Sequence, residues 1–552
     1  MDSVNDYEAD TAFLGDWGPF QRRLSLLLCI TMIPNGYGSL VVVFVADTPS
    51  HRCLVPVHGL NLTKEWRNAS IPLEEDGRPA ECSRYQLDTI RAYSEAGVLP
   101  SDINLTTVPR EGCLDGWEYD RSVYASTIVS EWDLVCGQKW KKPLTLSAYF
   151  CGFLVGSFIS GQLSDRFGRK IVLFVTLVGQ TLCAFIQGFC HSWMAFVIMY
   201  FLSGMCHISN YLAAFVLGTE TLSPRVREFF STAGSCFFFA LGYVLLPLHA
   251  YFMREWRMLQ LGITTPGFLL LILWWFIPES PRWLLSQGRV AEAEAIVKYA
   301  AKKNNVEVPA TIFTPRKKEC GSDTENVNIC DMLRSPNIRW MSAVLWLVWN
   351  TIAMAYLALS LNTSNLHGDA YFNCFLSGAV EIPAYLATWI MFRCCPRRLT
   401  MAGSLFSSGF FLLVTQLIPA DLHWVAVTLE MMGKFSLTVA FAHVYAYSAE
   451  LYPTVVRTTA LGACSMASRI GSILAPYILY LRSYSVSLPY MLMSGLITTA
   501  SLLSLLLPES YGMPLPETVA HMQPFPGCCR KNTYKRTHTK EEESERKSVD
   551  VE

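Results

Sequence analysis

The stretch GQLSDRFGRK at residues 161–170 decides the fold of this 552-residue chain. It places one carboxylate and three cations around a glycine turn. Apolar runs at 144–163 and 171–191 flank it, and each approaches the roughly 20 residues that cross the hydrocarbon core of a bilayer. A charged turn between two such runs predicts two membrane helices whose ends are held by a charge lock.

Apolar runs of this length recur along the chain. Charged residues make up only 16% of it, against about 25% in an ordinary soluble domain, which indicates that lipid is the main solvent. The first run is too long for the apolar part of a cleavable signal and predicts a signal anchor. The predicted spans are 24–46, 144–163, 171–191, 194–218, 230–251, 257–277, 341–362, 371–392, 400–418, 422–447, 459–481 and 487–507.

The runs predict an all-α polytopic membrane protein with twelve transmembrane helices in two six-helix halves. Basic residues gather in alternate loops, and short loops rich in Lys and Arg stay in the cytosol. Both termini are therefore predicted to be cytosolic, with Arg254 and Arg257 as exceptions on the outer side. The predicted domains are a cytosolic N-terminus 1–23, a first span 24–46, an extracellular domain 47–143, spans two to six at 144–277, a cytosolic loop with short helices 278–340, spans seven to twelve at 341–507, and a largely disordered tail 508–552.

The hydrophilic segment 47–143 has the marks of the secretory lumen. It holds three glycosylation sequons, at Asn61, Asn68 and Asn104, and sequons are used only on that side. Four cysteines in the same segment predict disulfides, and four cysteines allow three pairings that sequence cannot separate. These cysteines are Cys53, Cys82, Cys113 and Cys136.

Three motifs recur at equivalent places in the two halves. The charged turn at 161–170 has an echo at 393–398, which lacks the acid. A Glu and an Arg seven residues apart follow the fourth and tenth spans, and Pro-Glu-Ser closes the sixth and twelfth. Such repetition predicts a duplicated carrier. We expect a cytosolic gate whose charges pair when the cavity opens outward and separate when it opens inward: Asp165, Arg166, Arg169, Glu220, Arg227, Glu279, Arg282 and Arg457.

Charged side chains within spans are costly, so they indicate function. Glu381 lies in the eighth predicted span, Lys434 in the tenth and Arg469 in the eleventh. Opposite charges from different helices around one cavity suit a zwitterion. Arg469 is predicted to bind its carboxylate, because a guanidinium can grip one bidentately.

Aromatic faces are the appropriate receptors for the other end, a quaternary ammonium that donates no hydrogen bond. The spans offer Tyr211, Phe237, Phe238, Trp346, Trp349, Tyr356, Phe441 and Tyr445. Since an aromatic in a span more often packs than binds, we expect only Tyr211, with its neighbour Asn210, and Phe441 to contact the solute. His207 and His443 are interpreted as hydrogen-bonded helix contacts.

GQLSDRFGRK resembles the loop signature of the major facilitator superfamily. The whole chain, with STIVSEWDLVC (126–136), ISNYLAAFVLGTE (208–220), AELYPTVVR (449–457) and MASRIGSILAPY (466–477), resembles the organic cation/anion/zwitterion transporter family, nearest to its organic cation/carnitine branch. In classical cation carriers of that family the position of Arg469 is acidic, while Glu381 matches the cation-handling branches. The combination implies a preference for zwitterions.

The resemblance implies a plasma-membrane carrier that takes up carnitine, ergothioneine or similar betaines by alternating access, with sodium as the coupling ion. Asn35, Gln180 and Glu450 match family positions tied to sodium or substrate. No ATP binding is expected, because the segment 218–225 lacks the second glycine and the lysine of a phosphate-binding loop. A sodium-independent polyspecific cation or anion exchanger is the alternative.

Other classes fit less well. The net charge of −1 gives no basic field for nucleic acid. The sequence has no HExxH motif, no Cys/His metal spacing and no nucleophile elbow, so no metal site or enzyme activity is expected. A receptor would not need a repeated half with paired cytosolic charges. Besides lipid and solute, a cytosolic scaffold at the tail stays an open partner.

Overall fold

The computed structural model describes most of the chain. The described residues are 7, 10–56, 62–74, 77–223, 226–227, 230, 234–309, 312–313, 335–366, 368–513, 516, 522 and 525–526. The sequon residue Asn61, the end of the segment 218–225 and nearly all of the tail lie outside them.

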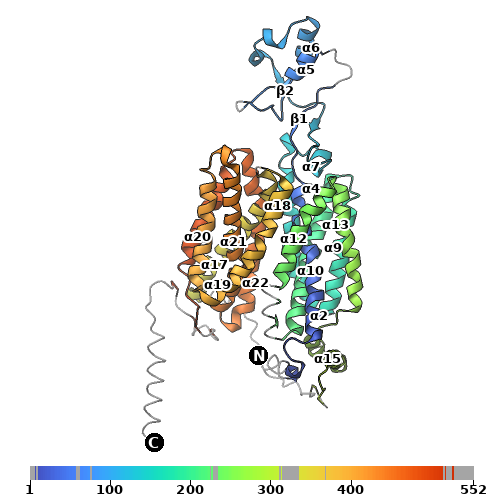
Figure 1. Cartoon of the computed structure of the whole chain (residues 1–552), viewed down its shortest axis with the longest axis vertical. Helices are drawn as coiled ribbons and strands as arrows, with labels where there is room; N and C mark the ends of the chain where they lie inside the picture. Colours follow the sequence, from blue (N-terminus) through green and yellow to red (C-terminus); the bar gives the residue numbers. More distant parts are fainter. Residues whose placement is uncertain are drawn as a thin grey trace. The chain divides into compact units, whose positions relative to one another are not determined.

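The first half supplies six helical spans (Figure 1). The first span is divided between α2 and α3, and Pro34 lies in the first turn of α3. Proline has no backbone N–H to donate, so a helix interior does not tolerate it without a break. The elements are α2 (Pro19–Ile30), α3 (Ile33–Leu40), α4 (Val42–Val45), α8 (Lys141–Phe167), α9 (Arg169–Gln187), α10 (Trp193–Thr221), α12 (Ser235–Phe252) and α13 (Trp256–Leu270), which η6 (Leu271–Trp275) continues.

The second half repeats this count. Ten of the described helices are long and apolar enough to cross a membrane, and the shorter α23 together with α22 brings the spans to twelve. The elements are α17 (Pro336–Leu361), η7 (Asn362–Asn365), α18 (Ala370–Ala379), α19 (Glu381–Cys394), α20 (Arg397–Thr415), η8 (Ala420–Leu422), α21 (His423–Leu451), α22 (Thr454–Tyr480), η9 (Leu481–Ser483) and α23 (Leu488–Ser504). On the segment 278–340, α14 (Pro281–Ser286) and α15 (Val290–Asn304) are described.

The chain forms two compact units. One comprises 1–316, 357–382 and 473–484, and the other comprises 317–356, 383–472 and 485–552. Within the first, small residues let α8 and α10 approach closely: a Cβ at Gly152 would lie 2.2 Å from the carbonyl oxygen of Phe201, and one at Gly204 2.3 Å from that of Tyr149. This is the packing that membrane helices use, because apolar burial alone does not hold them together in lipid.

The segment 47–143 folds around two small antiparallel sheets. β1 (His51–Cys53) pairs with β4 (Trp117–Tyr119), and β2 (Arg84–Tyr85) pairs with β3 (Arg110–Glu111). The helices are α5 (Lys64–Ala69), α6 (Leu87–Glu95) and α7 (Ile128–Glu131), with single turns η2 (Pro100–Asp102), η3 (Leu105–Thr107) and η4 (Cys136–Gln138). A core of Trp66, Tyr85, Ile90 and Val108 is too small to be stable alone.

Two disulfides reinforce this segment and decide among the three pairings. Cys53 bonds to Cys113, and Cys82 bonds to Cys136. Each closes a loop of more than 50 residues, so its entropic stabilisation is about 4 kcal/mol. We expect Cys82→Ser to lower the surface level severalfold in a biotinylation assay, whereas Cys394→Ser, at an exposed reduced cysteine, should leave it unchanged. An unchanged level for Cys82→Ser would contradict the prediction.

Both described sequons are accessible. Asn68 and Asn104 are exposed. The Thr106 hydroxyl of the same sequon donates to Asn104 Oδ1 at 2.7 Å. Glycosylation at these asparagines stays a prediction.

One of the two basic exceptions on the predicted outer side, Arg257, has a structural explanation. Arg257 forms an ion pair with Glu131 of α7, and it also donates to the carbonyl oxygens of Gly188 and Cys190, at 2.7 Å each. Trp256 Nε1 donates to the second oxygen of Glu131 at 2.7 Å. The charge of Arg257 is therefore neutralised by Glu131, and its guanidinium is held by two carbonyl oxygens that follow α9. This explains why a basic residue can stand on the predicted outer side.

Candidate functional site

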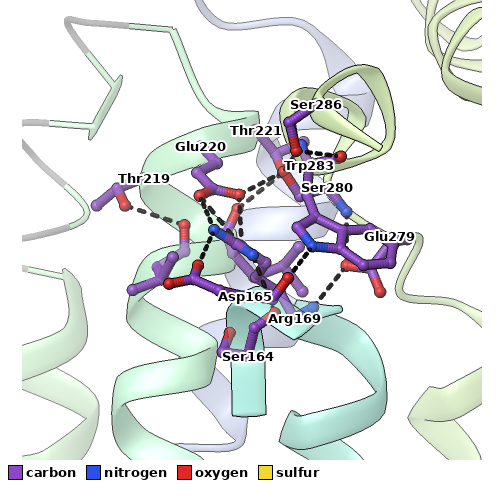
Figure 2. Close-up of polar contacts among 12 residues, drawn as sticks. Ser164, Asp165, Arg169, Thr219, Glu220, Thr221, Glu279, Ser280, Trp283 and Ser286 are labelled. Atoms are coloured by element: carbon purple, nitrogen blue, oxygen red, sulfur yellow. Dashed lines mark hydrogen bonds and ion pairs between the residues drawn. The ribbon is translucent and has the colours of Figure 1, made fainter. Parts of the chain in front are cut away.

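The stretch GQLSDRFGRK at residues 161–170 forms the centre of a cluster of charged side chains. The cluster lies at the end of α8, the start of α9 and the end of α10. Gly168, with φ of 102°, reverses the chain between α8 and α9 in a conformation that favours glycine. Arg169 then begins α9 and binds Glu220 through Nε at 3.1 Å and through Nη2 at 2.9 Å (Figure 2). Its guanidinium also donates to the carbonyl oxygen of Ser164 at 2.9 Å and pairs with Asp165 at 2.9 Å.

The third repeated motif completes this cluster. Glu279 accepts hydrogen bonds from the backbone N–H groups of Arg169 at 3.0 Å and Lys170 at 3.1 Å, so its carboxylate caps the positive end of α9. Ser280, which follows Glu279 in the same motif, donates a hydrogen bond to Glu220. Trp283 Nε1 donates to the carbonyl oxygen of Asp165 at 2.9 Å (Figure 2). Three motifs separated along the chain thus meet at one place.

The second half builds the same cluster from its own copies. Glu509 accepts from the backbone N–H groups of Arg397 at 2.8 Å and Arg398 at 3.1 Å. Arg397 pairs with Glu450 at 3.3 Å, and Ser510 Oγ donates to Glu450 at 2.6 Å. The turn at 393–398 therefore makes the same kinds of contact as the first turn.

The copies share the central arginine, and one of the positions at which they differ reverses the charge. Four residues before the central arginine, the first turn has Asp165 and the second has Arg393, whose guanidinium lies 4.1 Å from the centroid of the Trp389 ring. Arg397 and Glu509 were absent from the predicted gate. Comparing the two Pro-Glu-Ser repeats with the two arginine turns, position by position, would have identified both.

The other predicted gate residues make local contacts. Arg227 donates to the carbonyl oxygen of Leu222 at 3.2 Å, and Arg457 donates to that of Tyr452 at 3.2 Å, which is another equivalence between halves. The guanidinium of Arg282 lies 4.9 Å from the centroid of the Tyr7 ring. That of Arg166 lies 5.4 Å from the centroid of the ring of its neighbour Phe167.

Tyr7 shows how enclosed the first cluster is. Its phenol lies beside Arg282 and near Glu220 and Arg227, and burial raises its pKa to about 12. Arg169 and Glu220 expose only 11% and 20% of their side chains, whereas Asp165 exposes 75%. Since solvent screens exposed pairs, the pair of Arg169 with Glu220 contributes more electrostatic energy than the pair of Arg169 with Asp165.

The predicted solute and sodium residues of the first unit lie on α3, α9, α10 and the start of α19. Asn210 is buried, accepts from Asn35 Nδ2 at 3.3 Å and donates to the carbonyl oxygen of Leu173 at 3.0 Å. Tyr211 is half-buried and stacks on Phe215 at 6.3 Å between ring centroids. Glu381 is fully buried.

Two buried amide oxygens of this unit are available to a ligand. Asn35 Oδ1 and Gln180 Oε1 accept no hydrogen bond within the described part of the chain. Buried polar atoms nearly always have a partner, so an unpaired oxygen calls for an explanation such as a bound ion or water. Glu450, the third predicted sodium residue, belongs to the other unit and is already paired with Arg397.

The second unit gathers four of the predicted aromatic residues. Phe441 stacks on Tyr356 at 5.2 Å and lies 5.8 Å from Tyr445, whose ring is 4.3 Å from Trp349. The Lys434 ammonium lies 5.5 Å from the centroid of the Tyr356 ring. The Tyr356 ring of this cluster therefore lies within the range of a cation–π contact with Lys434.

Arg469 is half-buried on α22, where this helix packs closely on α17. Asn350 Nδ2 of α17 donates to the carbonyl oxygen of Ala467 at 3.1 Å, and a Cβ at Gly471 would lie 2.2 Å from the carbonyl oxygen of Asn350. Two tight contacts on either side of Arg469 fix the backbone that carries its guanidinium. The next residue, Ile470, is 50% exposed, so α22 turns another face outward.

Both histidines make the hydrogen bonds expected of helix contacts. His207 Nδ1 lies 2.8 Å from the hydroxyl of Tyr149. His443 Nε2 lies 3.1 Å from the carbonyl oxygen of Arg397, so this residue supports the second charge cluster even though it shares a helix with Phe441.

The fold and the duplicated charge clusters define a two-half membrane carrier, and comparison with known proteins agrees. A family model described as sugar (and other) transporter matches residues 118–518. The human organic cation/carnitine transporter 2 is 51% identical over 99% of each chain. Mouse solute carrier family 22 member 4 is 52% identical over 96% of this chain and 97% of that protein. The chain belongs to this transporter family, in its organic cation/carnitine branch.

Solved structures support the fold alone. The inward-open xylose transporter XylE from E. coli matches with a TM-score of 0.58 at 12% identity, over 91% of this chain and 100% of that one. The protein therefore has the major facilitator fold. Family and fold point to a transporter, and not to an enzyme.

Proposed function

We propose that this protein takes up small zwitterionic or cationic organic solutes, such as carnitine, ergothioneine or similar betaines, across the plasma membrane. The aromatic cluster of Trp349, Tyr356, Phe441 and Tyr445 carries this proposal, because it gathers several ring faces in one place. A quaternary ammonium would be attracted to such ring faces without needing a hydrogen bond. The printed names of the relatives, organic cation/carnitine transporters, agree with this solute class.

The carboxylate of the solute is assigned to Arg469. A guanidinium binds a carboxylate with two parallel hydrogen bonds, and it stays charged in any environment. Tyr211, Asn210 and Glu381 of the first unit stay predicted solute residues. Their burial within spans makes them costly to keep unless they serve packing or transport.

Sodium is the proposed coupling ion, with Asn35 and Gln180 as ligands. Their unpaired buried oxygens support this, since hard cations prefer oxygen donors. Glu450 is assigned to the second charge cluster, because Arg397 and Ser510 already occupy its carboxylate.

The cycle is proposed to be alternating access, with both termini in the cytosol. The two charge clusters brace the helix ends of each half, and the predicted gating follows if some of their pairs exchange partners during the cycle. A network is needed for this, because single exposed pairs contribute only about 0–1 kcal/mol.

Uptake of labelled carnitine, ergothioneine and tetraethylammonium into cells tests the proposal directly. With sodium outside, uptake of the two zwitterions should exceed that with choline at least tenfold, because the ion gradient drives concentration. Tetraethylammonium, which has no carboxylate, should depend little on sodium. Equal zwitterion uptake in both media would favour the sodium-independent exchanger, and absence of all three would refute the proposed solute class.

A further inference from the structure

Helices from both sequence halves contact one another within the first compact unit. In the first compact unit, Ser147 Oγ of α8 donates to the carbonyl oxygen of Ile473 on α22 at 2.8 Å. The hydroxyl of Tyr243 on α12 donates to Ser377 Oγ on α18 at 2.8 Å. These contacts join helices of the first sequence half to helices of the second.

Asp47 lies directly after α4, at the end of the first span that is predicted to face outward. It is 8% exposed, and its Oδ1 accepts from the backbone N–H of Thr48 at 2.9 Å and from Ser364 Oγ of η7 at 3.2 Å. Lys142 Nζ, at the start of α8, donates to Thr48 Oγ1 at 3.0 Å. One buried carboxylate and its neighbour thus join the ends of the first, second and seventh spans.

An aromatic group covers the carboxylate. Tyr371 of α18 stacks on Phe44 with centroids 5.3 Å apart, and it lies edge to face with Tyr124 at 6.1 Å. Burial, and then the charge of Asp47, raise the pKa of the Tyr124 phenol well above its usual value, so this hydroxyl keeps its proton beside the carboxylate.

These contacts are suited to opening and closing. A buried carboxylate is costly unless charges and hydrogen bonds compensate it, and here one of these hydrogen bonds comes from Ser364 of the other half. If the ends separate, water can replace the bond from Ser364 at little net cost. The closed and open arrangements can then differ by a small free energy, as a transport cycle requires.

We propose that Asp47 is the positioning residue that latches the outer ends closed during the cycle, by binding Ser364 and by attracting Lys142. Its release accompanies outward opening. The proposal rests on the proposed carrier function, but it concerns the entrance and not the choice of solute.

Cys374 provides a probe of the latch. This reduced cysteine is fully buried on α18, one helical turn from both Tyr371 and Ser377, so opening should expose it. A membrane-impermeant methanethiosulfonate reagent is applied outside intact cells, and a Cys374→Ser background corrects for other thiols. We expect Asp47→Ala to raise the labelling rate at least tenfold, and Asp47→Asn to raise it less, because the amide keeps an acceptor oxygen.

Ser364→Ala removes only the hydrogen bond between the halves and should raise labelling about threefold. Thr363→Ala is the matched control, since its hydroxyl donates to Ser360 of the same segment at 3.2 Å. If the Asp47→Ala variant reaches the surface and its Cys374 is labelled at the wild-type rate, the latch is overturned. If that variant does not reach the surface, unchanged labelling of Ser364→Ala overturns it instead.

The labelling needs no solute, so failure of the latch and failure of the proposed function are distinguishable. In uptake assays Asp47→Asn should lower the maximal rate severalfold and leave KM unchanged or lower. An increase in KM with an unchanged maximal rate would place Asp47 in solute binding and contradict its role as a latch.

Discussion

Arg469→Ala is expected to abolish carnitine and ergothioneine uptake, with at least a hundredfold loss in kcat/KM at normal surface expression. Removing one partner of a desolvated ionic contact costs about 3–5 kcal/mol, which corresponds to factors of a hundred or more. The tight contacts of α17 with α22 around Ala467 and Gly471 involve backbone atoms of α22. The helix should therefore keep its place without the guanidinium.

Two further variants make this test specific. Arg469→Lys keeps the charge and loses the planar fork, so we expect it to recover only part of the uptake. Arg393→Ala, which removes a guanidinium stacked on Trp389 in the same unit, should leave KM unchanged. Unchanged zwitterion uptake by Arg469→Ala would remove this residue from the site while leaving the transporter assignment intact.

Glu220→Gln is expected to lower the maximal uptake rate at least tenfold with less than a twofold change in KM. The substitution removes the charge that faces the Arg169 guanidinium, and Arg169 exposes only 11% of its side chain. A tenfold loss corresponds to about 1.4 kcal/mol, which is moderate for a partly buried pair. Initial rates at saturating carnitine, corrected for surface protein, measure the effect.

Asp165→Asn is the informative comparison, because Asp165 pairs with the same arginine but exposes 75% of its side chain. Its maximal rate should fall less than threefold. Thr219→Val controls for changes next to Glu220, since the Thr219 hydroxyl donates only to its own helix, at Val216 (Figure 2). A larger effect of Asp165→Asn than of Glu220→Gln would contradict the assigned ranking.

Sequence was sufficient to predict the class of fold. The length of an apolar run is a local property that the thickness of the bilayer dictates, so twelve spans could be counted without knowledge of their packing. Repetition of GQLSDRFGRK, of the Glu and Arg pair and of Pro-Glu-Ser then indicated two related halves. The same signals led to the transporter family that the comparisons confirm.

The partners of each charge were not predictable in this way. Motif spacing identified Arg169, Glu220 and Glu279 as a group, but it did not show that Glu279 binds backbone N–H groups while Glu220 binds the guanidinium. Motif spacing also did not identify Arg397 and Glu509, because the turn that contains Arg397 lacks the aspartate found in the first turn. Helix ends that meet in space are far apart in the chain, and local patterns carry no record of that distance.

The sequence by itself determined that this is a membrane carrier of two related halves with a disulfide-bonded segment after the first span. Only the tertiary structure decided which cysteines pair, which aromatic residues cluster and which carboxylate joins the outer helix ends. The physical reason is the distance along the chain over which each property acts. Apolar length and charge in loops act on the nearest bilayer surface, whereas a disulfide, a cation over a ring or a buried carboxylate depends on which segments the folded chain brings within a few ångströms.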